Sequence, residues 1–86
     1  MNTPTILMYS RVTCPYCVAA RNLLKSKQLE WQEISIDAEP DRRDEMIEKS
    51  GRKTVPQVFI GSIHVGGFDD LNAANQSGQL DQWLGR

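Results

Sequence analysis

Two cysteines separated by two residues are the side chains in this chain best suited to chemistry. Cys14 and Cys17 are its only cysteines, and they follow a short apolar run that ends at Tyr9. A C-x-x-C pair between a strand and a helix is typical of thiol redox centres. A thiol at the start of a helix is stabilised as the thiolate, the form that attacks disulfides. The spacing therefore predicts a redox pair.

A structural disulfide and a zinc site are the alternative interpretations of these cysteines. Closing a loop of about four residues contributes only about 2 kcal/mol by the loop-entropy relation, against about 4.7 kcal/mol for 100 residues. Such a bond would not persist in a compartment that keeps thiols reduced. Structural zinc needs four ligands, and the lone His64 is the only further soft candidate. Redox chemistry is therefore favoured, and we expect no metal site.

The two cysteines have different expected positions on the helix, which assigns their roles. Pro15 favours the first helical position, so Cys14 should lie at or beside the helix cap. Unpaired N–H groups and the positive end of the helix dipole stabilise an anion there. Cys17 lies one turn further in. We expect Cys14 to be the nucleophile and Cys17 the resolving thiol that releases it from a mixed disulfide.

Other segments contain residues suited to ligand binding. Pro56 is either an ordinary edge-strand proline or, with a cis peptide bond, it turns the preceding backbone groups outward toward an extended ligand. Gly66 and Gly67 allow close backbone approach before a helix start that favours anions. Asp69 by itself is interpreted as the N-cap of that helix. Arg11 is either a carboxylate-binding group or an ordinary surface arginine.

The elements that must position these residues follow from hydrophobic periodicity and from glycine and proline. We expect the order strand, helix, strand, helix, hairpin, helix. The expected strands are 5–10, 31–36, 57–60 and 63–65, and the expected helices run from 14 to about 28, from 41 to about 50, and from 69 through 84 with an interruption near Gly78. A right-handed strand–helix–strand crossover makes the first two strands parallel. The hairpin completes a four-stranded mixed sheet with helices on both faces, an α/β fold whose first strand ends at the redox pair.

Length and charge exclude several classes of protein. The 86 residues, 1–86, make one domain with a small core. The net charge of −1 predicts neither a nucleic acid nor a membrane as partner.

The charged residues are unevenly distributed along the chain. Only bases precede Glu30, and most acids lie between Glu30 and Glu48. This distribution indicates either two solvated helix faces, one basic and one acidic, or a positive rim near Cys14 that attracts anions. Without a signal-like or membrane-length apolar segment, we expect a cytoplasmic monomer.

Three blocks of sequence together resemble the glutaredoxin family, specifically its short bacterial dithiol class. The blocks are RVTCPYC at 11–17, RKTVPQVFIG at 52–61 and HVGGFDDL at 64–71. The C-x-x-C motif alone is moderately specific, whereas three blocks in this order are highly specific, and their spacing agrees across nearly the whole chain. The resemblance implies a thioredoxin-like fold and a glutathione-dependent thiol–disulfide oxidoreductase.

The resemblance also implies the roles of individual residues. Glutathione is the implied co-substrate, with no tightly bound cofactor, and Cys14 is implied to attack disulfide-containing or glutathionylated proteins. By position, Thr54, Val55 and a cis Pro56 pair with the glutathione backbone; Gly67, Phe68, Asp69 and Asp70 receive its γ-glutamyl end; Arg11 and Arg43 face its glycine carboxylate; and Tyr16 lines the groove.

The chain departs from the family pattern at two positions. Arg11 stands where relatives usually have lysine, which keeps the charge but replaces a point ammonium with a planar fork. Phe68 stands where several relatives have a further cysteine, which excludes a regulatory disulfide at that corner.

Two other functions remain open at this point. In an iron–sulfur carrier, two copies would hold a cluster through Cys14 and bound glutathione, but Pro15 and Tyr16 differ from the glycine or serine of such relatives. An electron donor recharged by thioredoxin reductase, as for ribonucleotide reductase, would fit a Trp-Cys-Gly-Pro-Cys pattern better than the motif found here. Residues 66–70 and Arg11 favour glutathione.

Overall fold

A four-stranded mixed sheet forms the centre of the molecule. The structure, a computed structural model, describes residues 4–85. Its strands are β1 (Ile6–Ser10), β2 (Gln32–Ser35), β3 (Gln57–Ile60) and β4 (Ile63–Gly66), in the spatial order β2-β1-β3-β4. β1 runs parallel to β2 and antiparallel to β3, and β3 pairs antiparallel with β4. The expected sheet, with two parallel strands and an added hairpin, is confirmed.

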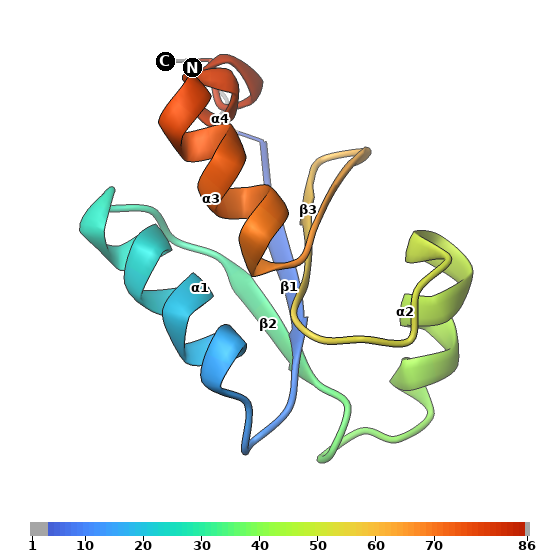
Figure 1. Cartoon of the computed structure of the whole chain (residues 1–86). Helices are drawn as coiled ribbons and strands as arrows, with labels where there is room; N and C mark the ends of the chain where they lie inside the picture. The colour runs from blue at the N-terminus through green and yellow to red at the C-terminus, as the bar shows by residue number, and fades with distance from the viewer. Residues whose placement is uncertain (1–3, 86) are drawn as a thin grey trace.

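Helices cover both faces of this sheet, as expected. α1 (Pro15–Ser26), α3 (Phe68–Ser77) and the short α4 (Gln79–Trp83) lie on one side, and α2 (Arg42–Ser50) lies on the other (Figure 1). The predicted interruption near Gly78 is confirmed, because this residue separates α3 from α4 at a φ of +85°. Left-handed backbone of this kind favours glycine.

The interpretation of Asp69 as an N-cap is wrong. The N-cap of α3 is Gly67, and Asp69 is the second residue of the helix. Asp70, one residue further on, accepts a hydrogen bond from the Gly67 N–H at 3.2 Å. The Asp70 carboxylate, inside the first turn, therefore pairs with the backbone N–H of the N-cap residue, a donor that has no partner within the helix.

The alternation of side chains along the strands divides the core into two clusters. Met8 on β1 and Val58 on β3 face α1 and α3, whereas Tyr9 and Phe59 face α2. Tyr9 is fully buried, and its hydroxyl donates a hydrogen bond to Glu45 on α2. Burial and the neighbouring Glu45 carboxylate raise the pKa of Tyr9 far above its ordinary value, so this side chain is a fixed neutral donor. The β1 strand is thus held from both sides.

A network around Glu33 ties α1 to the edge of the sheet. The Glu33 carboxylate accepts hydrogen bonds from Arg21 Nη2 at 2.6 Å and Ser10 Oγ at 2.6 Å. Trp31 Nε1 donates a third at 3.0 Å. Burial alone would raise the pKa of Glu33, but these donors lower it to about 2. The network holds the end of β1, immediately before the residues that lead to Cys14.

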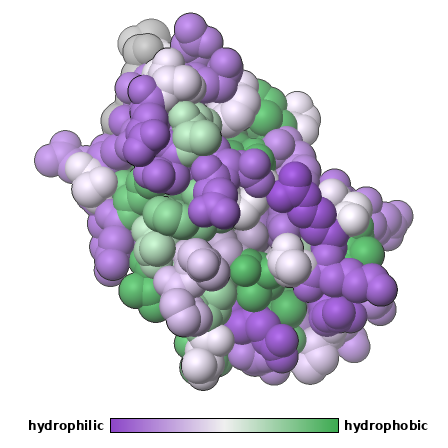
Figure 2. Space-filling model, in the orientation of Figure 1, coloured by the Kyte–Doolittle hydropathy of each residue, from purple (hydrophilic) through white to green (hydrophobic). Residues whose placement is uncertain are grey.

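The surface has no large segregated apolar face in the view of Figure 2. Hydrophilic and hydrophobic residues are interspersed there over the helices and the sheet (Figure 2). Among residues 4–85, no helix combines the length and the apolar character required to cross a bilayer.

Candidate redox active site

Cys14 is the N-cap of α1, and this position was expected from Pro15. Its backbone is extended, with φ −151° and ψ 100°, and Pro15 is the first helical residue. The Cys14 Sγ accepts a hydrogen bond from the Cys17 backbone N–H at 3.1 Å. The two cysteines are joined as a disulfide, with their Cα atoms 5.1 Å apart. Cys17 is fully buried and Cys14 is 8% exposed, so the cysteine at the cap is the more accessible of the two.

The loop between β1 and Cys14 is held by an aspartate that sequence reasoning missed. Asp37, just after β2, accepts a hydrogen bond from the Val12 N–H at 2.9 Å and another from Arg11 Nε at 3.0 Å. The backbone donor and the guanidinium lower the pKa of Asp37 below its ordinary value. Arg11 therefore faces Asp37 in this structure. No pattern in the sequence marks this contact, because it depends on the parallel pairing of β1 with β2.

A groove of about 270 Å³ lies beside the cysteine pair. The residues lining it come from the start of α1, the loop before β3 and the start of α3: Tyr16, Arg52, Thr54, Val55, Pro56, Gly67, Phe68, Asp69 and Asp70. The Cys14 Sγ lies 3.9 Å from the Val55 carbonyl oxygen, so the sulfur adjoins this groove. The Val55–Pro56 peptide bond is cis, as the resemblance implied.

An aromatic pair forms one wall of the groove. The rings of Tyr16 and Phe68 stack with their centroids 6.4 Å apart and their planes inclined by 28°. Tyr16 is 63% exposed. The pair therefore links the first turn of α1 to the first turn of α3 and leaves an apolar surface next to the cysteines.

An ion pair connects two other walls. Arg52 Nη1 lies 2.9 Å from Asp70 Oδ2. The Arg52 guanidinium and the Gly67 N–H lower the pKa of Asp70. Gly66 leaves room for this pair: its φ is +117°, and a Cβ atom there would collide with the Asp70 carboxylate and lie 3.1 Å from Arg52 Nη1. The glycine is required by its conformation and by this close approach.

The structure brings together eight of the ten residues assigned to glutathione from the resemblance. They are Tyr16, Thr54, Val55, Pro56, Gly67, Phe68, Asp69 and Asp70, all lining the groove. Arg11 and Arg43 do not line it: Arg11 pairs with Asp37, and Arg43 is an exposed residue of α2. Their roles stay predictions. Sequence reasoning assigned no role to Arg52, although its position two residues before Thr54 was a usable signal.

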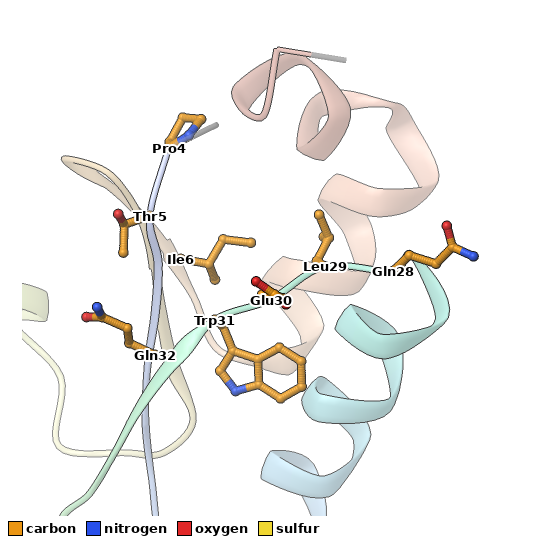
Figure 3. A pocket seen from close by; sticks show the side chains of 8 residues that line it. All are labelled: Pro4, Thr5, Ile6, Gln28, Leu29, Glu30, Trp31 and Gln32. Carbon is orange, nitrogen blue, oxygen red and sulfur yellow. The ribbon is translucent and has the colours of Figure 1, made fainter. Parts of the chain in front are cut away.

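A larger cavity of about 520 Å³ lies near the other end of β1. It is formed by the start of β1 and the segment between α1 and β2, through Pro4, Thr5, Ile6, Gln28, Leu29, Glu30, Trp31 and Gln32 (Figure 3). It contains neither cysteine and no other nucleophile suited to redox chemistry. We therefore assign the chemistry to the smaller groove beside Cys14.

The fold and the site define a thioredoxin-like protein with a redox-active cysteine pair. The Glutaredoxin family model matches residues 6–65, and the chain belongs to this family. It is therefore a thiol–disulfide oxidoreductase.

Individual relatives agree with this assignment. Glutaredoxin 3 of Escherichia coli strain K12 is 51% identical over 77 residues, which are 90% of this chain and 93% of that protein. The solution structure of glutaredoxin from Brucella melitensis has a TM-score of 0.84 at 49% identity, covering 98% of this chain and 91% of that chain. A crystal structure of buckwheat glutaredoxin in complex with glutathione has a TM-score of 0.86 at 30% identity, covering 94% and 76% of the two chains.

Proposed function

We propose that this protein uses glutathione to reduce protein disulfides and to remove glutathione from glutathionylated proteins. The observation that carries the proposal is the position of Cys14 Sγ, which accepts the Cys17 N–H at 3.1 Å and lies 3.9 Å from the Val55 carbonyl at the groove. In the reduced protein, the first contact would stabilise a Cys14 thiolate at the helix cap. The second supports attack by that sulfur on a peptide bound in the groove.

For a glutathionylated protein, the reaction has two exchange steps. The Cys14 thiolate attacks the glutathione sulfur, the S–S bond breaks, and the electron pair leaves with the protein thiol. The product is a Cys14–glutathione mixed disulfide. A second glutathione thiolate attacks the glutathione sulfur of that adduct, which releases oxidised glutathione and restores the Cys14 thiolate. Each step forms one S–S bond and breaks one.

For a protein disulfide, both cysteines take part. Cys14 attacks one sulfur of the substrate, whose second sulfur leaves as a thiolate. Cys17 then attacks Cys14, which frees the reduced substrate and leaves the Cys14–Cys17 disulfide that the structure contains. Two glutathione molecules reduce this disulfide in two further exchanges. The 5.1 Å separation of the Cα atoms supports this role for Cys17.

The groove supports glutathione as the ligand by its size and by the groups along it. Glutathione is an extended tripeptide, and the groove offers backbone at Thr54 and Val55, the apolar Tyr16–Phe68 pair, and a charged end at Arg52 and Asp70. The complex of the buckwheat relative, whose chain is 30% identical, also contains glutathione. Reduction by glutathione is consistent with a cytoplasmic location, which we propose for this protein.

A coupled assay tests the proposed function. The oxidised protein is mixed with glutathione, glutathione reductase and NADPH, and a glutathionylated peptide is added as substrate. We expect NADPH oxidation that requires both glutathione and the protein. Reduction by thioredoxin reductase and NADPH, with glutathione inactive, would overturn the proposal.

A further inference from the structure

We propose that Gln57 and His64 are positioning residues for the groove, acting on Thr54 from inside the sheet. This inference rests on the proposed function. Gln57 is 0% exposed at the start of β3, a strand whose other residues are apolar. An amide buried without partners is costly. Its partners therefore explain what a polar side chain does in this strand.

The amide of Gln57 bridges the loop before β3 and the strand β4. Its Nε2 donates to the Thr54 carbonyl oxygen at 3.0 Å and lies 3.2 Å from Thr54 Oγ1. Its Oε1 lies 2.7 Å from His64 Nε2. Gln57 thus holds both the backbone and the side chain of Thr54, one of the residues that line the groove.

The direction of these hydrogen bonds follows from the chemistry of the groups. The Thr54 carbonyl only accepts, so the NH₂ group of Gln57 must face it and the amide oxygen must face His64. His64 Nε2 therefore carries a proton and donates. Burial and the nearby Arg52 lower the pKa of His64 while Asp70 opposes them, which favours the neutral ring. The acceptor at Gln57 Oε1 then assigns its one proton to Nε2. These hydrogen bonds form a chain from His64 through Gln57 to Thr54, which we call the relay.

His64 is itself held in place by the sheet. Its register partner on β3 is Phe59, and the two rings lie 4.9 Å apart at 30°. Phe59 packs in the core beneath α2. The relay therefore starts from a fixed ring and ends at Thr54, next to Val55, whose carbonyl lies 3.9 Å from the Cys14 Sγ. Loss of the relay should misplace the peptide-binding backbone and leave the thiol unchanged.

Two disulfide substrates distinguish these effects. The reduced protein is reacted with oxidised glutathione, which carries a peptide backbone, and with 2-hydroxyethyl disulfide, which carries none. The quantity compared is the rate with oxidised glutathione divided by the rate with 2-hydroxyethyl disulfide. We expect Gln57→Leu and His64→Phe to lower this ratio about tenfold, the scale of a lost buried hydrogen bond. His64→Gln, which can still donate to Gln57, should recover most of the ratio. Val58→Ala, a core change in the same strand, should destabilise the protein and keep the native ratio.

Each outcome decides a different question. A native ratio in Gln57→Leu and His64→Phe, whether the two rates are unchanged or fall by the same factor, would overturn the positioning role. A native protein that does not prefer oxidised glutathione would overturn the proposed function itself. Nitrogen shifts of His64 in the native protein provide a test that needs no variant: we expect the proton on Nε2, and a neutral ring with the proton on Nδ1 would contradict the relay.

Discussion

Arg52 Nη1 and Asp70 Oδ2 lie 2.9 Å apart and join the loop before β3 to the first turn of α3. The two side chains are 49% and 47% exposed. An ion pair this exposed contributes about 0–1 kcal/mol to stability. Its main effect should therefore be on the groove that the two residues line, where it sets the distance between two walls and presents charge to a ligand.

Replacing Arg52 by methionine should separate binding from folding. We expect the KM for a glutathionylated peptide to rise about fivefold because the variant loses a charged contact at the groove. The melting temperature should fall by no more than about 4–8 °C, the shift for a loss of about 1 kcal/mol in a domain of this size. Steady-state kinetics and thermal unfolding measure the two effects. Lys53→Met, which removes the adjacent charge outside the groove lining, is the matched control; an equal rise in KM there would refute the assignment.

Replacing Cys17 by serine should separate the two reactions. The backbone N–H of residue 17 still donates to Cys14 Sγ, so removal of glutathione from a glutathionylated peptide should continue. Reduction of a protein disulfide should fall on the order of 100-fold, because no second thiol releases the mixed disulfide. Both rates are measured with the same glutathione-coupled assay. Retention of either activity by Cys14→Ser would show that the nucleophile is assigned wrongly.

Glu33 predicts a dependence of stability on pH. Its pKa is about 2 in the folded protein, below the ordinary value of 4.5, so ionised Glu33 stabilises the fold at neutral pH. Glu33→Gln should lower the free energy of unfolding by about 1–2 kcal/mol at pH 7, a value reduced by the solvent that still reaches this side chain. The difference from the native protein should shrink as the pH falls from about 4.5 toward 2, where the native carboxyl also becomes protonated.

Urea unfolding at pH 7 and at pH 2.5 measures this difference. Glu48→Gln, an exposed position on α2, is the control and should change stability little at either pH. A Glu33→Gln difference that stays constant across the two values would contradict the account of the network.

The elements of this fold are predictable from sequence because local signals agree with one another. Pro15 marks the start of α1, Gly78 separates the last two helices, and a strand–helix–strand unit followed by a hairpin predicts a four-stranded mixed sheet. The spatial order β2-β1-β3-β4 is known only from the structure. The position of Cys14 at a helix cap follows from the same signals. Asp69 was assigned wrongly because an aspartate near a helix start is a suitable cap, whereas α3 begins at Phe68 and its N-cap is Gly67.

The contacts that hold the site together were not predictable in the same way. Arg52 reaches Asp70, and His64 reaches Gln57, only after β3 and β4 have paired. Asp37 reaches the loop before Cys14 only because β2 pairs with β1. The residue types alone do not mark these partners, since each contact forms only when two separate elements have come together.

The pH dependence of alkylation at Cys14 tests the central claim most directly. The reduced native protein is treated with iodoacetamide across a pH series, and the two cysteines are followed separately by mass spectrometry. We predict that Cys14 reacts with a pKa between about 3.5 and 7.5, as for thiols at helix starts, and that Cys17 reacts more slowly throughout. A pKa of about 8.5 for Cys14, that of an ordinary free cysteine, would contradict the account.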